Sequence, residues 1–435
     1  MAVHVYGDNT ANSPKAAPHF SRKHSYHSHL RNMFLERDSV SPPPASTPSS
    51  ASPKPLVYHV TSYGADPTGK ADSTDAILAA ISDALKGPAN GFLMQGIVNL
   101  AGARVDLDGG NYLISRPIQF PLAGRGNLVI HGGSLTASGD FPDNGYLIDL
   151  SPASNNGSGY NYEFVTLRDL FLDSNFRGGG IQILLSRPTH HCRGDPGERN
   201  FSGTAIALSG NDNSITDVVI FSAATGILIS GQANTLSGVH CYNKATSFGG
   251  TGIYLKTPGL TQTRIVNSYL DFTGIVAEDP VQLTISSSFF LGDAYILFKS
   301  INGVVNGVNI VDNMFSGSDN GIDIVQLEQS NGPFNQIDQV VIDRNNVKGM
   351  KLKATVARGS VQGNGSSWTT DFNSVLVFPD LIKQVQYTFI TNGSSFPVHA
   401  LRNVSGNKVV IQSDVAVPAS VHVTADQGGV GSFSS

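Results

Sequence analysis

Several carboxylic acids in the middle of the chain are of the type that acid/base catalysis needs. Two carboxyl groups can hydrolyse a bond when one protonates the leaving oxygen and the other activates water or attacks. We take Asp195, Glu198 and Asp212 as the catalytic candidates. Each also has a structural reading, because Asp195 opens an Asp-Pro-Gly turn and Asp212 lies between two asparagines. Glu278 and Asp279, at a later turn, are open to the same two readings.

Basic residues in the same region are candidates for binding a negatively charged substrate. Arginine matches a carboxylate with two parallel N–H donors, and lysine provides a point charge. The substrate-binding candidates are Lys244, Lys256 and Arg264. For each of them, simple solvation at the surface is the alternative.

Histidine and cysteine clusters are weaker signals. His24, His27 and His29 have no frame of carboxylates or thiols around them, so we read them as solvated histidines. Cys192 and Cys241 are too few for a disulfide framework, and we read them as buried free thiols. The sequence therefore predicts no metal site.

The elements that must position these side chains form a repeat. Short apolar runs return along residues 205–324, and their starts are separated by about 20–27 residues, a spacing typical of a solenoid. The runs are Ala205–Leu208, Gly226–Ile229, Gly252–Leu255, Gly274–Val276, Ala294–Leu297 and Gly321–Ile324. Solenoid repeats bury their apolar faces only by stacking on one another.

A second apolar run follows each of these cores. Its bulky residues alternate with Asn, Ser, Asp or Thr, which is typical of a strand with one buried face. The sequence therefore predicts an all-β fold, a parallel β-helix with two or three short strands per coil. Coils stack about 4.8 Å apart. Acids in equal phase on neighbouring or next-neighbouring coils would then lie about 5 Å or about 10 Å apart, close enough for two carboxyl groups to act on one bond.

Composition limits the possible partners. The net charge is −5 and charged residues make up 14% of the chain, so no global field attracts nucleic acid or an anionic membrane. An acidic polysaccharide would need a local basic groove. No stretch of about 20 apolar residues exists, so we expect no transmembrane helix.

The chain divides into three regions. Residues 1–55 are rich in Ser, Pro and His, and we expect a disordered segment. Residues 56–350 hold the predicted parallel β-helix. Residues 351–435 lose the period, and we expect a β-rich region with antiparallel strands, including one at Val375–Phe378 and one at Gln384–Ile390.

The start of the predicted β-helix has its own signals. Leu56–Val60 reads as a short strand, and turn chemistry follows it. Ser73 or Thr74 can cap a helix that runs to about Leu85 with one apolar face. Such a helix would cover the open end of the solenoid, because terminal repeats must be covered.

Two sets of motifs resemble known proteins. Tyr63–Gly69 with Asp72–Ile77 resembles the opening motif of the pectate-lyase-like superfamily of right-handed parallel β-helices. Later blocks resemble the plant quartet-type polygalacturonases, and the resemblance runs from about residue 56 to the C-terminus. These blocks are Asp195–Arg199, Gly231–Asn234, His240–Thr246, Gly249–Leu255 and Glu278–Leu283.

The resemblance implies a glycosidase that cleaves α-1,4-galacturonosyl links of pectin by general acid/base hydrolysis, without an organic cofactor. It also implies a secreted, monomeric cell-wall protein, although we find no export signal at the start of this chain. A calcium-assisted lyase on the same fold remains a second possibility. A catalytically inactive, pectin-binding β-helix is a third.

One segment departs from the resemblance. After Gly178–Ile181 the quartet-type proteins carry further coils, whereas this chain passes directly to Leu184–Gly194, which neither alternates nor continues the period. When Arg187–Gly194 is translated back into possible codons and the reading frame is shifted by one base, the codons can encode the residues typical of the family. We therefore expect that coils are missing near residues 181–195, and we give His190, His191 and Cys192 no catalytic reading.

Overall fold

The computed structural model describes residues 56–151, 162–183, 189–192, 201–242, 249–259, 262–392 and 396–428. For residues 189–192 it describes the backbone alone. The segment predicted to be disordered, residues 1–55, lies outside the described residues. Residues from Pro55 onward form one compact unit.

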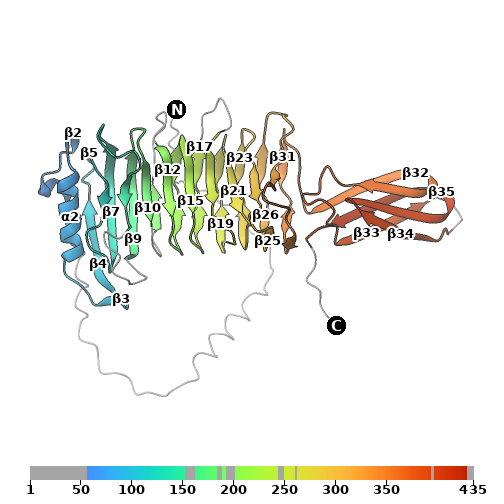
Figure 1. The fold of residues 1–435 in the computed structure, drawn as a ribbon, viewed down its shortest axis with the longest axis horizontal. Coiled ribbons are helices and arrows are strands. Elements are labelled where there is room, and N and C mark those ends of the chain that lie inside the picture. Colours follow the sequence, from blue (N-terminus) through green and yellow to red (C-terminus); the bar gives the residue numbers. More distant parts are fainter. Residues whose placement is uncertain are drawn as a thin grey trace, which may run out of the picture. The chain divides into compact units, whose positions relative to one another are not determined.

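Parallel strands build three long sheets, which confirms the predicted parallel β-helix (Figure 1). Sheet A contains, in spatial order, β1 (Val57–His59), β4 (Ile97–Asp106), β7 (Arg125–Ala137), β9 (Tyr162–Asp173), β11 (Thr189–Cys192), β13 (Ser214–Thr216), β16 (Thr235–Ser237), β19 (Thr263–Val266), β22 (Leu283–Ser286), β26 (Asn309–Val311) and β30 (Val341–Asp343). At its beginning it also holds β2 (Thr68–Asp72), β3 (Phe92–Met94) and β5 (Asn111–Ile114).

The other two sheets follow the same succession of coils. Sheet B contains β6 (Ile118–Gln119), β8 (Tyr146–Asp149), β10 (Gly179–Ile183), β12 (Phe201–Leu208), β15 (Ala223–Ile229), β18 (Thr251–Leu255), β21 (Gly274–Glu278), β24 (Ile296–Lys299) and β28 (Val325–Glu328). Sheet C contains β14 (Val219–Phe221), β17 (His240–Tyr242), β20 (Tyr269–Asp271), β23 (Phe289–Leu291), β27 (Met314–Ser316) and β31 (Asn346–Lys348). A short pair, β25 (Val304–Asn306) with β29 (Gln336–Asp338), lies outside them.

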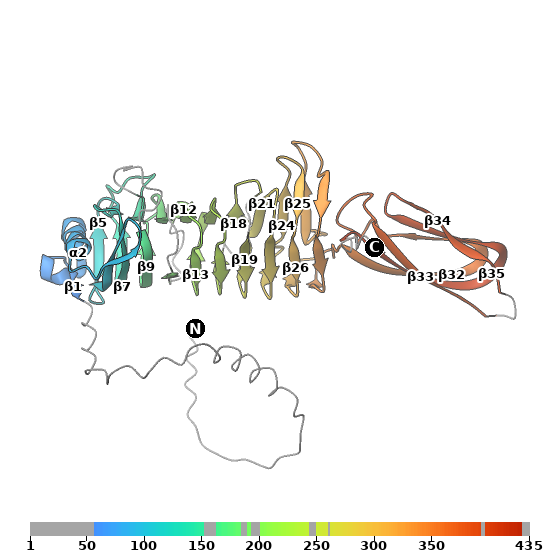
Figure 2. The ribbon, with the colours of Figure 1, turned by 90° about the horizontal axis from the view of Figure 1, so that it is seen from below.

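Each complete coil therefore has three strands, one in each sheet. The second apolar run of each period splits into a sheet A strand and a sheet C strand at a sharp corner. The corner residue has a positive φ, as at Asp217 (53°) and Asn267 (51°), which Asp, Asn and Gly adopt more readily than other residues. In Figure 2 the sheet A strands β13, β19 and β26 follow one another along the stack.

The core is a column of aliphatic side chains. Ile227, Ile253, Ile275 and Ile296 are paired in register on successive strands of sheet B, and all are fully buried. Ile253 therefore points into the core, as its place in the repeat predicts. Because every coil contributes its apolar residue at the same height, stacking alone removes these side chains from water.

The predicted phase fails at the sixth core. Gly321–Ile324 was expected to be a strand, but the strand of this coil is β28 (Val325–Glu328), and Val325 takes the place in register with Ile296. The segment near residues 184–194 was expected not to continue the period. Its residues Thr189–Cys192 nevertheless form β11, which pairs in parallel with β9 and β13.

A 3-10 helix, η1 (Val60–Tyr63), and an α-helix, α2 (Thr74–Lys86), lie at the N-terminal end of the coils (Figure 1). The apolar face of α2 is buried, as predicted, through Ile77, Ile81 and their neighbours. The predicted cap is wrong in detail. Ser73 makes no side-chain cap, and the carboxylate of Asp72 instead accepts the backbone N–H of Thr74 at 3.0 Å.

The last strands form an antiparallel sheet. They are β32 (Val356–Asp371), β33 (Gln384–Thr391), β34 (His399–Ser405) and β35 (Lys408–Asp426), and β35 pairs with the other three. The strand expected at Val375–Phe378 is wrong, because those residues form a turn and a bend in which Leu376 alone makes an isolated parallel bridge, with Ala354. The separate core of this sheet contains Trp368, Val409 and Val421.

Candidate active site

An open groove of about 540 Å³ lies on the outer face of sheet A. It brings together two residues singled out in the sequence, Asp212 and Arg264. Its lining residues are Asp212, Ala233, Thr235, Gln262, Arg264, Gln282, Thr284, Gly307 and Asn309. They come from equal positions on successive coils, since Thr235, Arg264, Thr284 and Asn309 follow one another in register.

The groove on sheet A is better suited to binding than to acid/base catalysis. Among the described residues that line this groove, Asp212 is the one acid, whereas hydrolysis by carboxyl groups needs two. Asp212 also has a structural role, because its φ of 57° places it at a left-handed corner that Ala233 and Gln262 occupy on the next coils. Arg264 is exposed and offers a fork of N–H donors beside hydroxyl and amide groups.

A row of alternating charge lies on the outer face of sheet B. Glu278, Lys299 and Glu328 are paired in register on three successive strands. Lys256 precedes them in the same phase, because Leu255 pairs with Ala277. The Nζ of Lys299 lies 3.6 Å from a carboxylate oxygen of Glu278. We call Lys256, Glu278, Lys299 and Glu328 the charged row.

The two carboxyl groups of the charged row, those of Glu278 and Glu328, have different surroundings. Glu278 is buried and accepts a hydrogen bond of 2.6 Å from the hydroxyl of Tyr254. Burial, and then the hydrogen bond to Glu278, raise the pKa of Tyr254 to about 12, so this hydroxyl stays a donor. Hydrogen bonds from Ser330, with a smaller contribution from the charge of Lys299, lower the pKa of Glu328.

The remaining candidates are divided between these two faces or lie beyond the described residues. Asp195, Glu198 and Lys244 lie outside the described residues. Lys256 belongs to the charged row of sheet B and not to the groove that holds Asp212 and Arg264. Of the candidates that the structure describes, Asp212 and Arg264 therefore lie together, and Lys256 lies on another sheet.

Comparison with known proteins decides the family. The chain is 59% identical over 424 residues to "Polygalacturonase QRT3" of Arabidopsis thaliana, an alignment that covers 89% of this chain and 88% of that protein. This chain belongs to the quartet-type polygalacturonase family. The alignment spans 424 positions, whereas 89% of the 435 residues is about 387, so about 37 positions of the relative have no counterpart in this chain.

The solved structures that resemble this chain are distant in sequence. One is "Geobacillus virus E2 - ORF18", with a TM-score of 0.47 and 12% identity over 83% of this chain and 78% of that chain. Another is DFA-IIIase from Arthrobacter chlorophenolicus A6, with a TM-score of 0.43 and 15% identity over 67% and 83%. We draw no functional argument from them. No family model matches the chain.

The adjacent acids Glu278 and Asp279 have different contacts in the structure, a difference that the sequence alone could not predict. Asp279 is buried, and its carboxylate accepts the backbone N–H groups of Ile301, Asn302 and Val304 at 3.1, 2.6 and 3.2 Å. It therefore holds the next turn in place. The adjacent Glu278 instead belongs to the charged row, in register with Lys299. Lys299 and Glu328 were not among the candidates, although their alternation with Lys256 and Glu278 at the ends of successive cores is a signal in the sequence.

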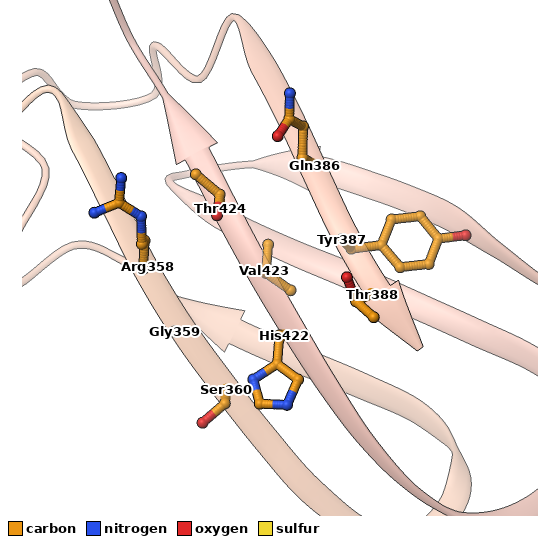
Figure 3. Close-up of a pocket in the computed structure, with 9 residues that line it drawn as sticks. All are labelled: Arg358, Gly359, Ser360, Gln386, Tyr387, Thr388, His422, Val423 and Thr424. Atoms are coloured by element: carbon orange, nitrogen blue, oxygen red, sulfur yellow. The ribbon is translucent and has the colours of Figure 1, made fainter. Parts of the chain in front are cut away.

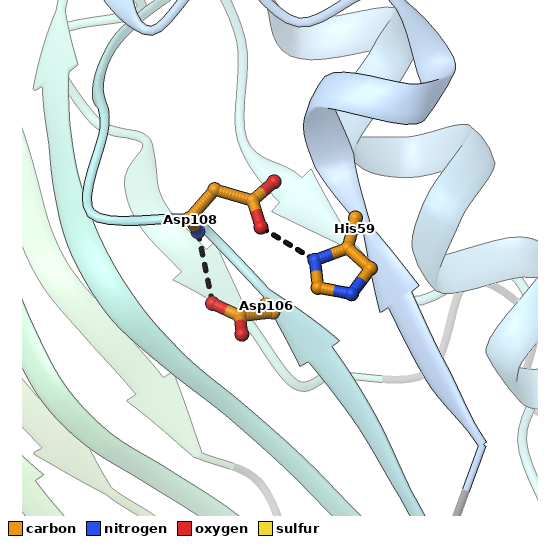
Figure 4. A group of neighbouring side chains, drawn as sticks. All are labelled: His59, Asp106 and Asp108. Atoms are coloured by element: carbon orange, nitrogen blue, oxygen red, sulfur yellow. Dashed lines mark hydrogen bonds and ion pairs between the residues drawn. The ribbon is translucent and has the colours of Figure 1, made fainter.

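Two clusters remain that could suggest other chemistry. His59, Asp106 and Asp108 bring ligand atoms within 4.8 Å of one another (Figure 4), but hydrogen bonds explain the group. His59 Nδ1 lies 2.5 Å from Asp108, and Asp106 accepts the N–H of Asp108 at 2.9 Å. Cys241 is a buried free thiol, as predicted, and burial raises its pKa to about 12, so it is no nucleophile.

In the described residues, no helix is long and apolar enough to cross a bilayer.

Proposed function

We propose that this chain hydrolyses the α-1,4-galacturonosyl links of pectin by general acid/base catalysis. The observation that carries the proposal is its 59% identity, over most of both chains, to a protein named polygalacturonase. The charged row supports it. Its lysines can bind galacturonan, which carries a carboxylate on each sugar, and its two glutamates provide the carboxyl groups that hydrolysis needs. The parallel coils supply the long surface that a polymer needs.

We assign the acid/base pair to Glu278 and Glu328. They lie two coils apart, which corresponds to about 9.6 Å along the stack. That distance is close to the upper end of the range for inverting glycosidases, about 6.5–9.5 Å. The lowered pKa of Glu328 favours the ionised form that a general base needs, which leaves the acid role to Glu278. Glu278 would protonate the glycosidic oxygen, and Glu328, whose pKa is lowered, would take a proton from the attacking water.

The cations of the two faces would bind the substrate carboxylates. Lys256 and Lys299 flank Glu278 in the charged row, so each would hold a galacturonate beside the scissile bond. Tyr254 would position Glu278 through its hydrogen bond. Arg264 would bind a more distant sugar in the sheet A groove.

The test compares Glu278→Gln and Glu328→Gln with Asp195→Asn, Glu198→Gln and Asp212→Asn, the rival acids. We expect each glutamine variant to lower kcat on polygalacturonate by about 100-fold or more, the usual contribution of a general acid or base. The rival variants should stay near wild type. Full activity in both glutamine variants, with loss in Asp195→Asn or Asp212→Asn, would return the chemistry to the sequence-derived acids. Release of ultraviolet-absorbing, unsaturated ends would instead indicate a lyase.

A catalytically inactive pectin-binding protein is the second candidate function. The stretches of the relative that have no counterpart here favour it, because they can include the catalytic coils. Restoring a family-like segment between Ile181 and Asp195 decides the matter. Activity in the restored form alone would support the second candidate. Equal activity in both forms would support the charged row.

We also propose that the protein is secreted to the cell wall as a monomer. Asn156, Asn200, Asn364, Asn392 and Asn403 open Asn-x-Ser acceptor sites. The last three are in the described residues and all are exposed. Protein isolated from its native tissue should shift in mobility after enzymatic removal of N-glycans. An unshifted protein in the cytosolic fraction would contradict the proposal.

A further inference from the structure

A second polar groove lies on the antiparallel sheet of the C-terminal region (Figure 3). It has a volume of about 660 Å³, and three strands each contribute three consecutive residues to it. These are Arg358–Ser360 of β32, Gln386–Thr388 of β33 and His422–Thr424 of β35. No residue of the sheet A groove or the charged row takes part.

Strand register orders this lining into rows. Arg358, Thr424 and Gln386 lie side by side in one row. Ser360, His422 and Thr388 form the row two residues along, on the same face of the sheet. The row between them consists of Gly359, Val423 and Tyr387. Its side chains point to the opposite face of the sheet, since Val423 is buried in the sheet's own core.

The two outer rows carry hydrogen-bond donors and one cation, the guanidinium of Arg358, but no carboxylate. Arg358 and His422 provide the basic groups, and hydroxyl and amide groups surround them. In the part of the chain that the structure describes, Arg358 has no ion-pair partner, whereas Arg116, Arg168, Arg177 and Arg344 each pair with an aspartate. An exposed guanidinium of this kind can bind a ligand carboxylate with two parallel N–H donors.

We propose that this groove binds an acidic oligosaccharide, a uronate chain, apart from the site of hydrolysis. Arg358 holds one carboxylate, and Ser360, Thr388, Gln386 and Thr424 hydrogen-bond the sugar hydroxyls. The identity of the polymer as galacturonan rests on the proposed function. The groove then keeps the protein on the polymer while the coils act on another part of it.

The experiment measures retention of the full chain in gels that contain polygalacturonate, and hydrolysis of a short oligogalacturonate in parallel. Arg358→Gln should weaken retention about tenfold, the effect expected when a charge-assisted hydrogen-bonded pair is lost. Hydrolysis of the short substrate should be unchanged. The matched control is Arg402→Gln, an exposed arginine on β34 that does not line the groove. The double variant Ser360→Ala/Thr388→Val tests the hydroxyl contacts without removing charge.

Retention by Arg358→Gln equal to that of wild type and Arg402→Gln would overturn the proposal. Equal retention on fully methyl-esterified pectin, which lacks the carboxylates, would overturn it as well. Failure of the proposed function gives a different result. Hydrolysis would then be absent from every form, while retention would still depend on Arg358.

Discussion

The parallel coils and the C-terminal sheet arrange polar side chains in opposite ways. In the coils, neighbours in a row come from equal positions in successive repeats, as Glu278, Lys299 and Glu328 do. In the C-terminal sheet, Arg358 meets Thr424 across an antiparallel pairing that joins distant parts of the sequence. The coils therefore repeat one chemical row along a polymer-sized surface. The sheet instead assembles a single groove from three strands.

The two regions also have separate apolar cores. The coil core runs through the column around Ile253, and the sheet core surrounds Trp368. If these cores are energetically independent, damage to one should leave the function assigned to the other. The predictions below test this separation.

The largest effect is expected for Ile253→Asp. Ile253 is fully buried, so the change places a carboxylate without a partner inside the column. Desolvation of a buried charge costs several kcal/mol. Thermal unfolding should show a large loss of stability or no folded protein. Ala224→Asp, at an exposed position on the neighbouring strand β15, should change the free energy of unfolding by less than about 0.5 kcal/mol. Equal melting of the two variants would contradict the packing of the column.

A smaller, local effect is expected for Trp368→Ala. Trp368 is buried and its ring packs edge-on against Phe389 at a centroid distance of 5.1 Å. Removing a buried tryptophan side chain costs about 3–5 kcal/mol. Retention on polygalacturonate should fall because β33 carries part of the groove, while hydrolysis of a short substrate should persist. Loss of both activities together would show that the two cores are coupled.

The same contrast explains what the sequence could predict. A repeat places each residue relative to its neighbours, so the column containing Ile253 and the corner at Asp212 follow from spacing. Where an inserted turn changes the spacing, the prediction shifts, as at Val325. The long strand β35 has no period, and its register depends on pairing with segments far away in the sequence. Arg358 and His422 therefore gave no signal as a group.

Within the site, residue type alone could not assign roles. Glu278 and Asp279 are adjacent acids at one turn, yet backbone N–H groups occupy the carboxylate of Asp279 while Glu278 contacts Tyr254. The difference depends on the direction in which each side chain points at the end of the strand. Three-dimensional contacts were needed to decide it.

The smallest effect is expected at the N-terminal end of the coils, from the pair His59 and Asp108. The hydrogen bond to Asp108, together with its charge, raises the pKa of His59. Burial opposes ionisation of Asp108, but hydrogen bonds from Thr61 and His59 outweigh it and lower the pKa of Asp108. The raised histidine pKa contributes stability below about pH 6.5, which is lost as pH rises through the folded value. The lowered aspartate pKa contributes stability above about pH 4, which is lost as pH falls through the folded value.

This pair should therefore stabilise the protein mainly between about pH 4 and pH 6.5. Melting temperatures of wild type and His59→Gln should differ by a small amount near pH 5.5 and converge above pH 8. Arg116→Gln, which removes another exposed ion pair, that of Arg116 with Asp75, is the control, because this pair contains no histidine. Its difference from wild type should stay constant over that range. A constant difference for His59→Gln as well would mean that His59 acts through packing and not through its charge.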